Sequence, residues 1–212
     1  QSIVAPDGTL FLDMIKLHPF SYAQEDQFFE KGNALPTCEI DGTRFGCLIC
    51  YDLRFPEVFS ALAPKTDCIL VPANWPERRK LHWCSLLTAR AIENQVYVAG
   101  INCVGTQDGL HYSGDSRFIA PDGTILQDAA VQQVVLSVTS PQKPLQKPDR
   151  RFLYKKTAVP IFIEVYYYNR KNHTNLMLDA KNRSDAAAPK RVYCLFYAHD
   201  VCQNNVVNRN NW

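Results

Sequence analysis

The chain has 212 residues, of which 46% are hydrophobic and 21% are charged, with 23 Lys and Arg against 21 Asp and Glu. A chain of this length buries roughly 70% of its unfolded surface, which is enough for one substantial core. The composition excludes a collagen-like, coiled-coil or fully disordered protein. The net charge of +2 gives no electrostatic reason to expect binding to nucleic acid or to an anionic membrane. The longest apolar stretch, residues 159–168, is interrupted by Glu164 and falls short of a membrane span, so we expect a soluble protein.

The chain contains eight cysteines. An even number suggests a disulfide framework mainly in short secreted proteins with small cores. Here most of the cysteines lie inside apolar runs, such as residues 46–50 and 68–71. We therefore expect buried, reduced thiols and a cytoplasmic protein.

Apolar runs and helical periodicity alternate along the first part of the chain. The apolar runs are expected to form strands at residues 44–50, 68–72, 96–101 and 134–138. Helices are expected at residues 55–63 and 76–94, because each begins with Pro followed by Glu. The apolar positions of the second helix are Leu81, Trp83, Leu86, Leu87 and Ile92. This alternation predicts an α/β fold.

A short repeat interrupts the alternation. Residues 5–10 read Ala-Pro-Asp-Gly-Thr-Leu, and residues 120–125 read Ala-Pro-Asp-Gly-Thr-Ile. Pro followed by Asp-Gly is a tight-turn signal, and strand-like residues flank both copies, so each copy predicts a β-hairpin. Two hairpins within an α/β chain indicate a mixed sheet.

The composition changes after a proline-containing stretch at residues 141–148, which predicts a loop. No glycine follows Gly123, and the chain beyond residue 157 is rich in Asn and Tyr. We expect one domain at residues 1–154 and an atypical C-terminal extension at residues 155–212.

The strongest local pattern is Gly-Cys-Leu-Ile-Cys-Tyr-Asp-Leu-Arg-Phe-Pro-Glu, at residues 46–57. It predicts a strand that carries Cys50 to its carboxyl end, where open α/β sheets place their ligands. The helix that starts near Pro56 would favour the thiolate through the positive charge of its N-terminus. The backbone N–H of Tyr51 is suited to donate to an oxyanion beside the Cys50 sulfur. Together these features are typical of an activated nucleophile.

The spacing alone leaves two other interpretations of Cys50 open. Cys50 could be an inert thiol that ends a buried strand. Cys47 and Cys50 could also form a redox or metal pair, although residues i and i+3 of a strand point to opposite faces. Five histidines are present, and the sequence selects none of them as a partner for the thiol.

Several ordered blocks resemble the nitrilase (carbon–nitrogen hydrolase) superfamily, and most closely its omega-amidase-like branch. The blocks are MIKLHPFSYAQEDQFFEKG, GCLICYDLRFPE, VPANWPERRKLHW and LLTARAIENQVYVAGINCVG, and the resemblance covers about residues 1–154. It implies a four-layer α-β-β-α sandwich that forms a homodimer. It also implies hydrolysis of a small-molecule amide through a cysteine thioester, without a metal or an organic cofactor.

The resemblance assigns catalytic roles to three side chains. Cys50 corresponds to the nucleophile, Lys16 to the family's lysine and Glu25 to its second acidic residue. The Lys16 ammonium would stabilise the tetrahedral intermediate together with the N–H of Tyr51, and Glu25 would orient Lys16 or the substrate.

A substrate carboxylate could bind to Arg54, Arg78 or Arg79, because a guanidinium suits bidentate recognition. Each of these arginines could equally be a solvated surface residue.

The chain also departs from the family pattern. The family's glutamate general base precedes the lysine block, so we expect this chain to lack the leading strand and helix together with that base. Cys103 stands where the family usually has Arg. The alternative to an amidase is therefore a catalytically impaired fragment or paralogue that acts as a binding or partner subunit.

Overall fold

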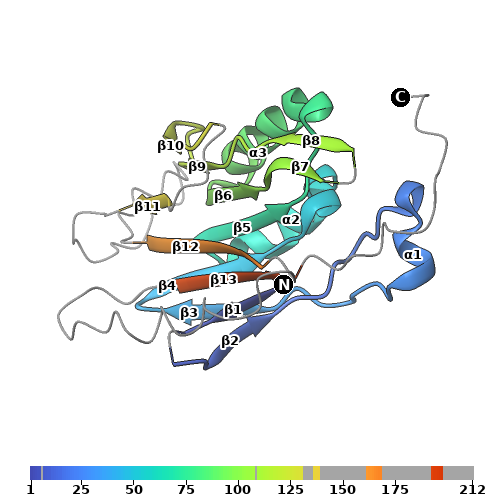
Figure 1. The fold of residues 1–212 in the computed structure, drawn as a ribbon. Helices are drawn as coiled ribbons and strands as arrows, with labels where there is room; N and C mark the ends of the chain where they lie inside the picture. Colours follow the sequence, from blue (N-terminus) through green and yellow to red (C-terminus); the bar gives the residue numbers. More distant parts are fainter. Residues whose placement is uncertain (6, 108, 131–135, 139–160, 169–191, 198–212) are drawn as a thin grey trace.

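The computed structural model describes residues 1–5, 7–107, 109–130, 136–138, 161–168 and 192–197. Most of the strands in this part of the chain form two mixed sheets (Figure 1). The remaining two form a separate hairpin of β7 (Val104–Gln107) and β8 (Leu110–Ser113). The mixed α and β architecture predicted from the sequence is confirmed. The domain boundary predicted at residue 154 lies outside the described residues.

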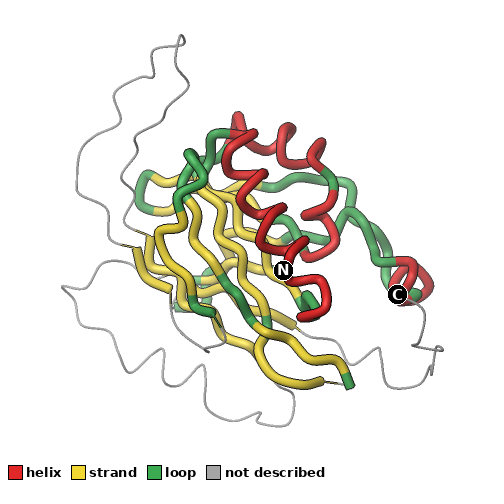
Figure 2. The backbone as a smooth tube through the Cα atoms, turned by 90° about the horizontal axis from the view of Figure 1, so that it is seen from above, coloured by secondary structure: helices red, strands yellow, loops and turns green. Residues whose placement is uncertain are grey.

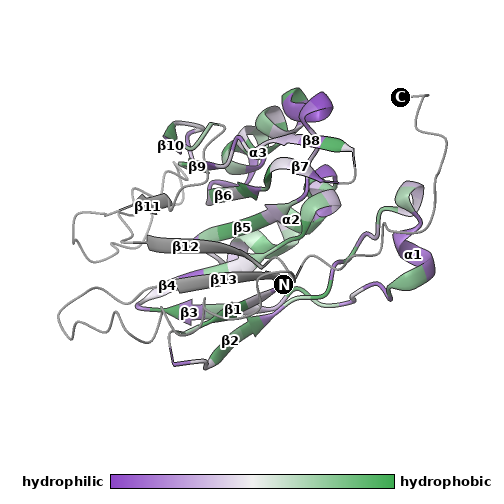
Figure 3. Cartoon of the chain, in the orientation of Figure 1, coloured by the Kyte–Doolittle hydropathy of each residue, from purple (hydrophilic) through white to green (hydrophobic). Residues whose placement is uncertain are grey.

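The larger sheet has six strands in the order β10-β9-β6-β5-β4-β3. They are β3 (Thr37–Ile40), β4 (Thr43–Cys47), β5 (Cys68–Ala73), β6 (Tyr97–Asn102), β9 (Arg117–Ile119) and β10 (Ile125–Asp128). The central strands β4, β5 and β6 are parallel, and the outer pairs are antiparallel. Every residue of β5 is buried, as expected for a central strand that is covered on both faces. The strand is largely hydrophobic in Figure 3.

Two helices cover one face of this sheet (Figure 2). They are α2 (Pro56–Leu62), which begins with Pro as predicted, and α3 (Lys80–Asn94), which follows the 3₁₀ turn Glu77–Arg79. A Cβ on Gly100 of β6 would lie 2.3 Å from Leu87 of α3, so the close approach of helix and strand requires glycine there.

The predicted inward face of α3 is only partly right. Trp83 and Leu87 are buried and lie on the same side of the helix at a spacing of four residues. Leu81 and Ile92 are 75% and 46% exposed, which contradicts the prediction that they face the core. Both lie off the stripe of the helix that Trp83 and Leu87 share, so helix geometry turns them away from the sheet.

The second sheet has five strands in the order β11-β12-β13-β1-β2. They are β1 (Ser2–Val4), β2 (Leu10–Asp13), β11 (Leu136–Val138), β12 (Ile161–Tyr168) and β13 (Val192–Tyr197). Ile3 and Leu12 of this sheet pack into the same hydrophobic core as Phe45 and Leu70 of the larger sheet. The described part of the chain therefore stacks a helical layer and two sheets.

Both predicted hairpins are confirmed. The Ala5 N–H donates to the Thr9 carbonyl at 2.8 Å, and the Ala120 N–H donates to the Thr124 carbonyl at 2.8 Å. The first turn connects β1 to β2, and the second connects β9 to β10.

In the described residues we find no helix with both the length and the apolar character needed to cross a membrane.

Candidate active site

The parallel strands β4, β5 and β6 end at one edge of the sheet, and the candidate site lies there. Cys50 follows β4, Asn74 follows β5 and Cys103 follows β6. The backbone N–H of Asn74 hydrogen-bonds the sulfur of Cys50. The backbone N–H of Cys103 donates to the carbonyl of Ala73 at 3.2 Å. Parallel strands bring their carboxyl ends together, which explains why residues so far apart in sequence meet here.

Cys50 does not lie in a strand, which corrects the predicted strand over residues 44–50. The strand β4 ends at Cys47, and Cys50 opens the 3₁₀ turn Cys50–Arg54. The φ angle of Cys50 is +48°, a left-handed conformation that costs an L-residue about 1–2 kcal/mol. Strained turns of this kind between a strand and a helix are typical of nucleophiles, because they project the side chain out of the sheet.

The thiol of Cys50 has a raised pKa, mainly because it is buried. The ammonium of Lys16 and the N–H of Asn74 act in the opposite direction, whereas Glu25 raises the pKa further. Burial therefore opposes the thiolate that the nearby helix N-terminus was expected to favour. Attack on a substrate requires loss of the thiol proton, because the thiolate is the nucleophile.

Lys16 and Glu25 lie together, as the resemblance implied. The Nζ of Lys16 lies 2.5 Å from Oε2 of Glu25, and the same oxygen accepts the Phe20 N–H at 2.8 Å. Glu25 is the first residue of the short helix α1 (Glu25–Phe28). The charges of both residues act on the Cys50 thiol, so the three predicted catalytic side chains belong to one electrostatic site. Their catalytic roles stay predictions.

The backbone around Lys16 is held by a close contact with a second segment. The Gly32 N–H donates to the Lys16 carbonyl at 2.7 Å. A Cβ on Gly32 would lie 2.3 Å from the Ile15 carbonyl oxygen, so only glycine allows this approach.

Asp52 is a residue of this site that the sequence reasoning missed. Its side chain is fully buried, and it accepts the His18 N–H at 2.9 Å and the Ile49 N–H at 3.0 Å. It also contacts Nδ1 of His18 at 2.8 Å. These contacts tie the loop that carries Lys16 to the turn that carries Cys50. The sequence did hold a signal for this role, because Asp52 is a charged residue in an otherwise apolar strand-to-turn segment. A charged residue in such a segment needs buried hydrogen-bond partners.

Arg54 lies at the same edge of the sheet. Its guanidinium carbon is 4.9 Å from the centre of the Trp75 ring, and its Nη2 is 3.2 Å from Nδ1 of His82. Burial, and then the charge of Arg79, lower the pKa of Arg54. Of the three candidate arginines, Arg54 is thus the one for which the structure shows both an aromatic contact and a histidine contact at this edge.

Asn102 fixes the Trp75 segment on which Arg54 rests. Its Oδ1 accepts the Trp75 N–H at 2.7 Å, and its Nδ2 donates to the carbonyls of Trp75 and Gly114 at 3.0 and 2.8 Å. Because a buried amide with all its groups satisfied is rigid, Asn102 is a second positioning residue that the sequence reasoning missed.

Cys103 brings no positive charge to the position where the resemblance expects arginine. It is 7% exposed, and burial raises the pKa of its thiol to about 12. Cys47 and Cys50 form no disulfide, and neither do the other cysteines for which the structure describes a side chain. Over the described ranges, His, Cys, Asp and Glu side chains form no group suited to hold a metal ion.

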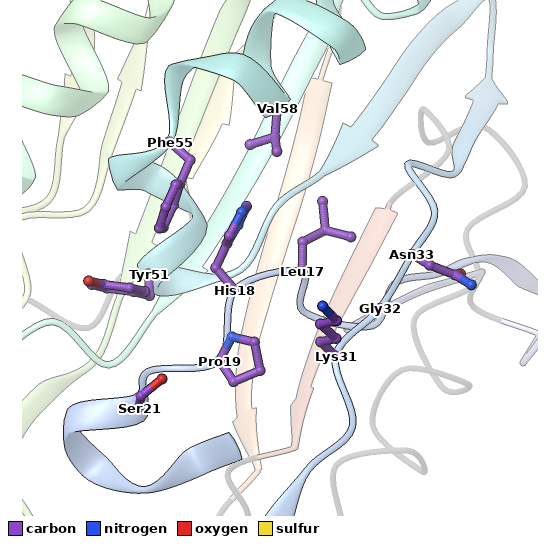
Figure 4. A pocket seen from close by; sticks show the side chains of 10 residues that line it. All are labelled: Leu17, His18, Pro19, Ser21, Lys31, Gly32, Asn33, Tyr51, Phe55 and Val58. Atoms are coloured by element: carbon purple, nitrogen blue, oxygen red, sulfur yellow. The ribbon is translucent and has the colours of Figure 1, made fainter.

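A separate cavity of about 630 Å³ lies next to the loop that follows Lys16 (Figure 4). The rings of His18 and Phe55 are stacked on each other in its wall, with their centres 3.6 Å apart. Tyr51 also lines this cavity, but Cys50, Lys16 and Glu25 do not. We therefore locate the candidate site at the strand ends and not in the cavity.

Comparison with known proteins identifies the class. The Carbon-nitrogen hydrolase family matches residues 1–143, so the chain belongs to the carbon–nitrogen hydrolase family.

Individual relatives agree with this assignment. The chain is 50% identical over 133 residues to Omega-amidase YafV of Escherichia coli K12, which covers 62% of this chain and 51% of the relative. It is 35% identical over 135 residues to the 2-oxoglutaramate amidase of Bacillus subtilis 168, covering 63% and 52%. The chain thus spans about half the length of these relatives.

Solved structures show the same similarity. The CN-hydrolase superfamily protein XC1258 of Xanthomonas campestris, which holds an arsenic adduct in its active site, matches with a TM-score of 0.54 at 37% identity. That match covers 60% of this chain and 51% of the other. An amidase mutant from Nesterenkonia sp. AN1, with an acetamide moiety added covalently at its active-site cysteine, matches with a TM-score of 0.56 at 29% identity. The second match covers 59% of this chain and 48% of the other.

Proposed function

We propose that the protein is an amidase that converts small ω-amides of dicarboxylic acids to the acid and ammonia through a thioester on Cys50. The observation that carries this proposal is the Lys16–Glu25 pair, whose charges act on the thiol of Cys50 at the carboxyl edge of the sheet. The omega-amidase and 2-oxoglutaramate amidase relatives support the substrate class.

The proposed reaction has two stages. The sulfur of Cys50 attacks the amide carbon and forms a C–S bond, the C–N bond breaks, and the thiol proton leaves with the nitrogen as ammonia. Water then attacks the thioester, which gives the carboxylic acid and returns a proton to the sulfur. In both stages negative charge develops on the substrate oxygen, where the Lys16 ammonium and the N–H of Tyr51 would stabilise it.

Glu25 has a positioning role in this scheme. Its carboxylate binds the ammonium of Lys16 and is itself held by the Phe20 N–H. A fixed ammonium needs no reorganisation when the substrate oxygen becomes charged, which is the main advantage of a preorganised site.

Arg54 is the proposed binding group for the second carboxylate of the substrate. It ends the same short turn that Cys50 opens, and a guanidinium matches a carboxylate in two parallel hydrogen bonds.

The proposal is tested by ammonia release from succinamate. We expect turnover by the wild-type protein, none by Cys50→Ala, and wild-type turnover by Cys38→Ala, which removes a partly buried thiol of β3. Mass spectrometry after treatment with an electrophilic glutamine analogue is expected to find the adduct on Cys50. A stable adduct without ammonia release would refute the amidase and support the impaired paralogue.

We also propose that the protein forms a homodimer in a reducing, cytoplasmic compartment. The exposed Leu81 and Ile92 of α3 support self-association, and the reduced state of the described cysteines supports the compartment. Light scattering that gives the mass of one chain across the micromolar range would refute the dimer.

A further inference from the structure

The surroundings of Arg54 hold a feature that the catalytic scheme does not use, namely the imidazole of His82 on α3. The two residues are 28 positions apart in sequence, and Nη2 of Arg54 lies 3.2 Å from Nδ1 of His82. A guanidinium can only donate hydrogen bonds, so Nδ1 must be the acceptor and the imidazole must be unprotonated at this nitrogen.

This hydrogen bond fixes a guanidinium whose other contacts within the described part of the chain are with ring faces. The Trp75 ring lies 4.9 Å from the Arg54 guanidinium carbon, and the Tyr51 ring lies 6.0 Å from it. Ring faces attract a cation but leave it free to rotate in their plane. The hydrogen bond to His82 sets the direction in which the N–H groups of the Arg54 guanidinium point.

Arg54 also lacks the usual partner of a half-buried arginine. Across the described residues, no carboxylate forms an ion pair with it, whereas Arg44, Arg90 and Arg117 each have one. The nearby charge of Arg79 opposes that of Arg54. A cation that is partly removed from water, repelled by a second cation and given no anion is suited to receive one from a ligand.

We propose that His82 is a positioning residue that aims Arg54 at the distal carboxylate of the substrate and thereby selects ω-amides of dicarboxylic acids over neutral amides. This inference rests on the proposed amidase function.

The test compares succinamate with butyramide, a neutral amide of similar length, in His82→Leu and His82→Asn. Leucine removes the acceptor, whereas the side-chain oxygen of asparagine can replace Nδ1 as an acceptor. We expect His82→Leu to lower the ratio of kcat/KM for succinamate to that for butyramide about tenfold, mainly through KM for succinamate. His82→Asn is expected to restore most of that ratio. Because His82 is exposed, neither variant should unfold the protein. The matched control is Ser85→Ala, an exposed position on the same helix.

Two results would overturn the proposal: an unchanged ratio in His82→Leu, whether or not both substrates lose activity equally, or no recovery of the ratio in His82→Asn. If the wild type releases ammonia from neither amide, the proposed function fails and the role of His82 is decided by binding. Calorimetry with Cys50→Ala protein should then find succinamate binding that His82→Leu weakens about tenfold. Absence of succinamate binding, or binding that His82→Leu leaves unchanged, would refute the positioning role.

Discussion

The buried carboxylate of Asp52 allows a quantitative prediction about how the site is held together. In Asp52→Ala, the backbone N–H groups of His18 and Ile49 lose an acceptor at 2.9 and 3.0 Å inside the protein. Hydrogen bonds to a charged group contribute about 1.5–3 kcal/mol each, and burying the carboxylate itself carries an opposing desolvation cost. We expect a net loss of about 3 kcal/mol in the free energy of unfolding. This is a large fraction of a total that is typically about 5–15 kcal/mol.

Urea denaturation followed by tryptophan fluorescence measures this loss. Asp52→Asn keeps one acceptor oxygen but turns a donor toward a backbone N–H, so its loss should be smaller, at about 1–2 kcal/mol. The matched control is Asp26→Ala, because Asp26 is exposed and its replacement should change the free energy of unfolding by less than about 0.5 kcal/mol. A loss below about 1 kcal/mol in Asp52→Ala would refute the argument that this residue ties the two segments together.

Two further predictions concern the reactivity of the thiols. Lys16→Ala is expected to raise the pH midpoint of Cys50 alkylation, because the ammonium lowers the pKa of this thiol; a downward shift in the pH–rate profile would contradict the proposed contact. Cys103, with a pKa of about 12, should be about one ten-thousandth thiolate at pH 8. Peptide mass spectrometry should therefore show its iodoacetamide labelling rising about tenfold per pH unit, and a plateau below pH 9 would refute the burial argument.

Some parts of the fold could be predicted because their signals are local. The turns at residues 5–10 and 120–125 depend on Asp-Gly pairs that favour the same backbone bend wherever they occur. The buried strand β5 could be predicted because a strand covered on both faces needs an unbroken apolar run. The inward face of α3 could not be fully predicted, because Leu81 and Ile92 are as apolar as the residues that do face the sheet.

The residues of the candidate site also fall into those that local patterns predicted and those that only the structure revealed. The pattern around Cys50 and the resemblance to a family located the candidate nucleophile Cys50 together with Lys16 and Glu25. The sequence predicted a lowered pKa for Cys50 because it showed the nearby helix but not the burial, which is the main cause that raises the pKa of this thiol. The contacts of Asp52 with His18 and of Arg54 with His82 join residues 34 and 28 positions apart, a distance over which no spacing rule applies.

The sequence by itself determined the alternation of strands and helices, the two hairpins and the candidate nucleophile, since each depends on residues close together in the chain. It also determined the family, through ordered blocks of residues spread over about residues 1–154. Only the tertiary structure decided that Cys50 stands in a left-handed turn, that Asp52 anchors the loop that carries Lys16, and that Arg54 lies on the Trp75 ring beside His82. The physical reason is that charge, burial and hydrogen bonding act through space, and the parallel strands bring together at one edge groups that the chain keeps far apart.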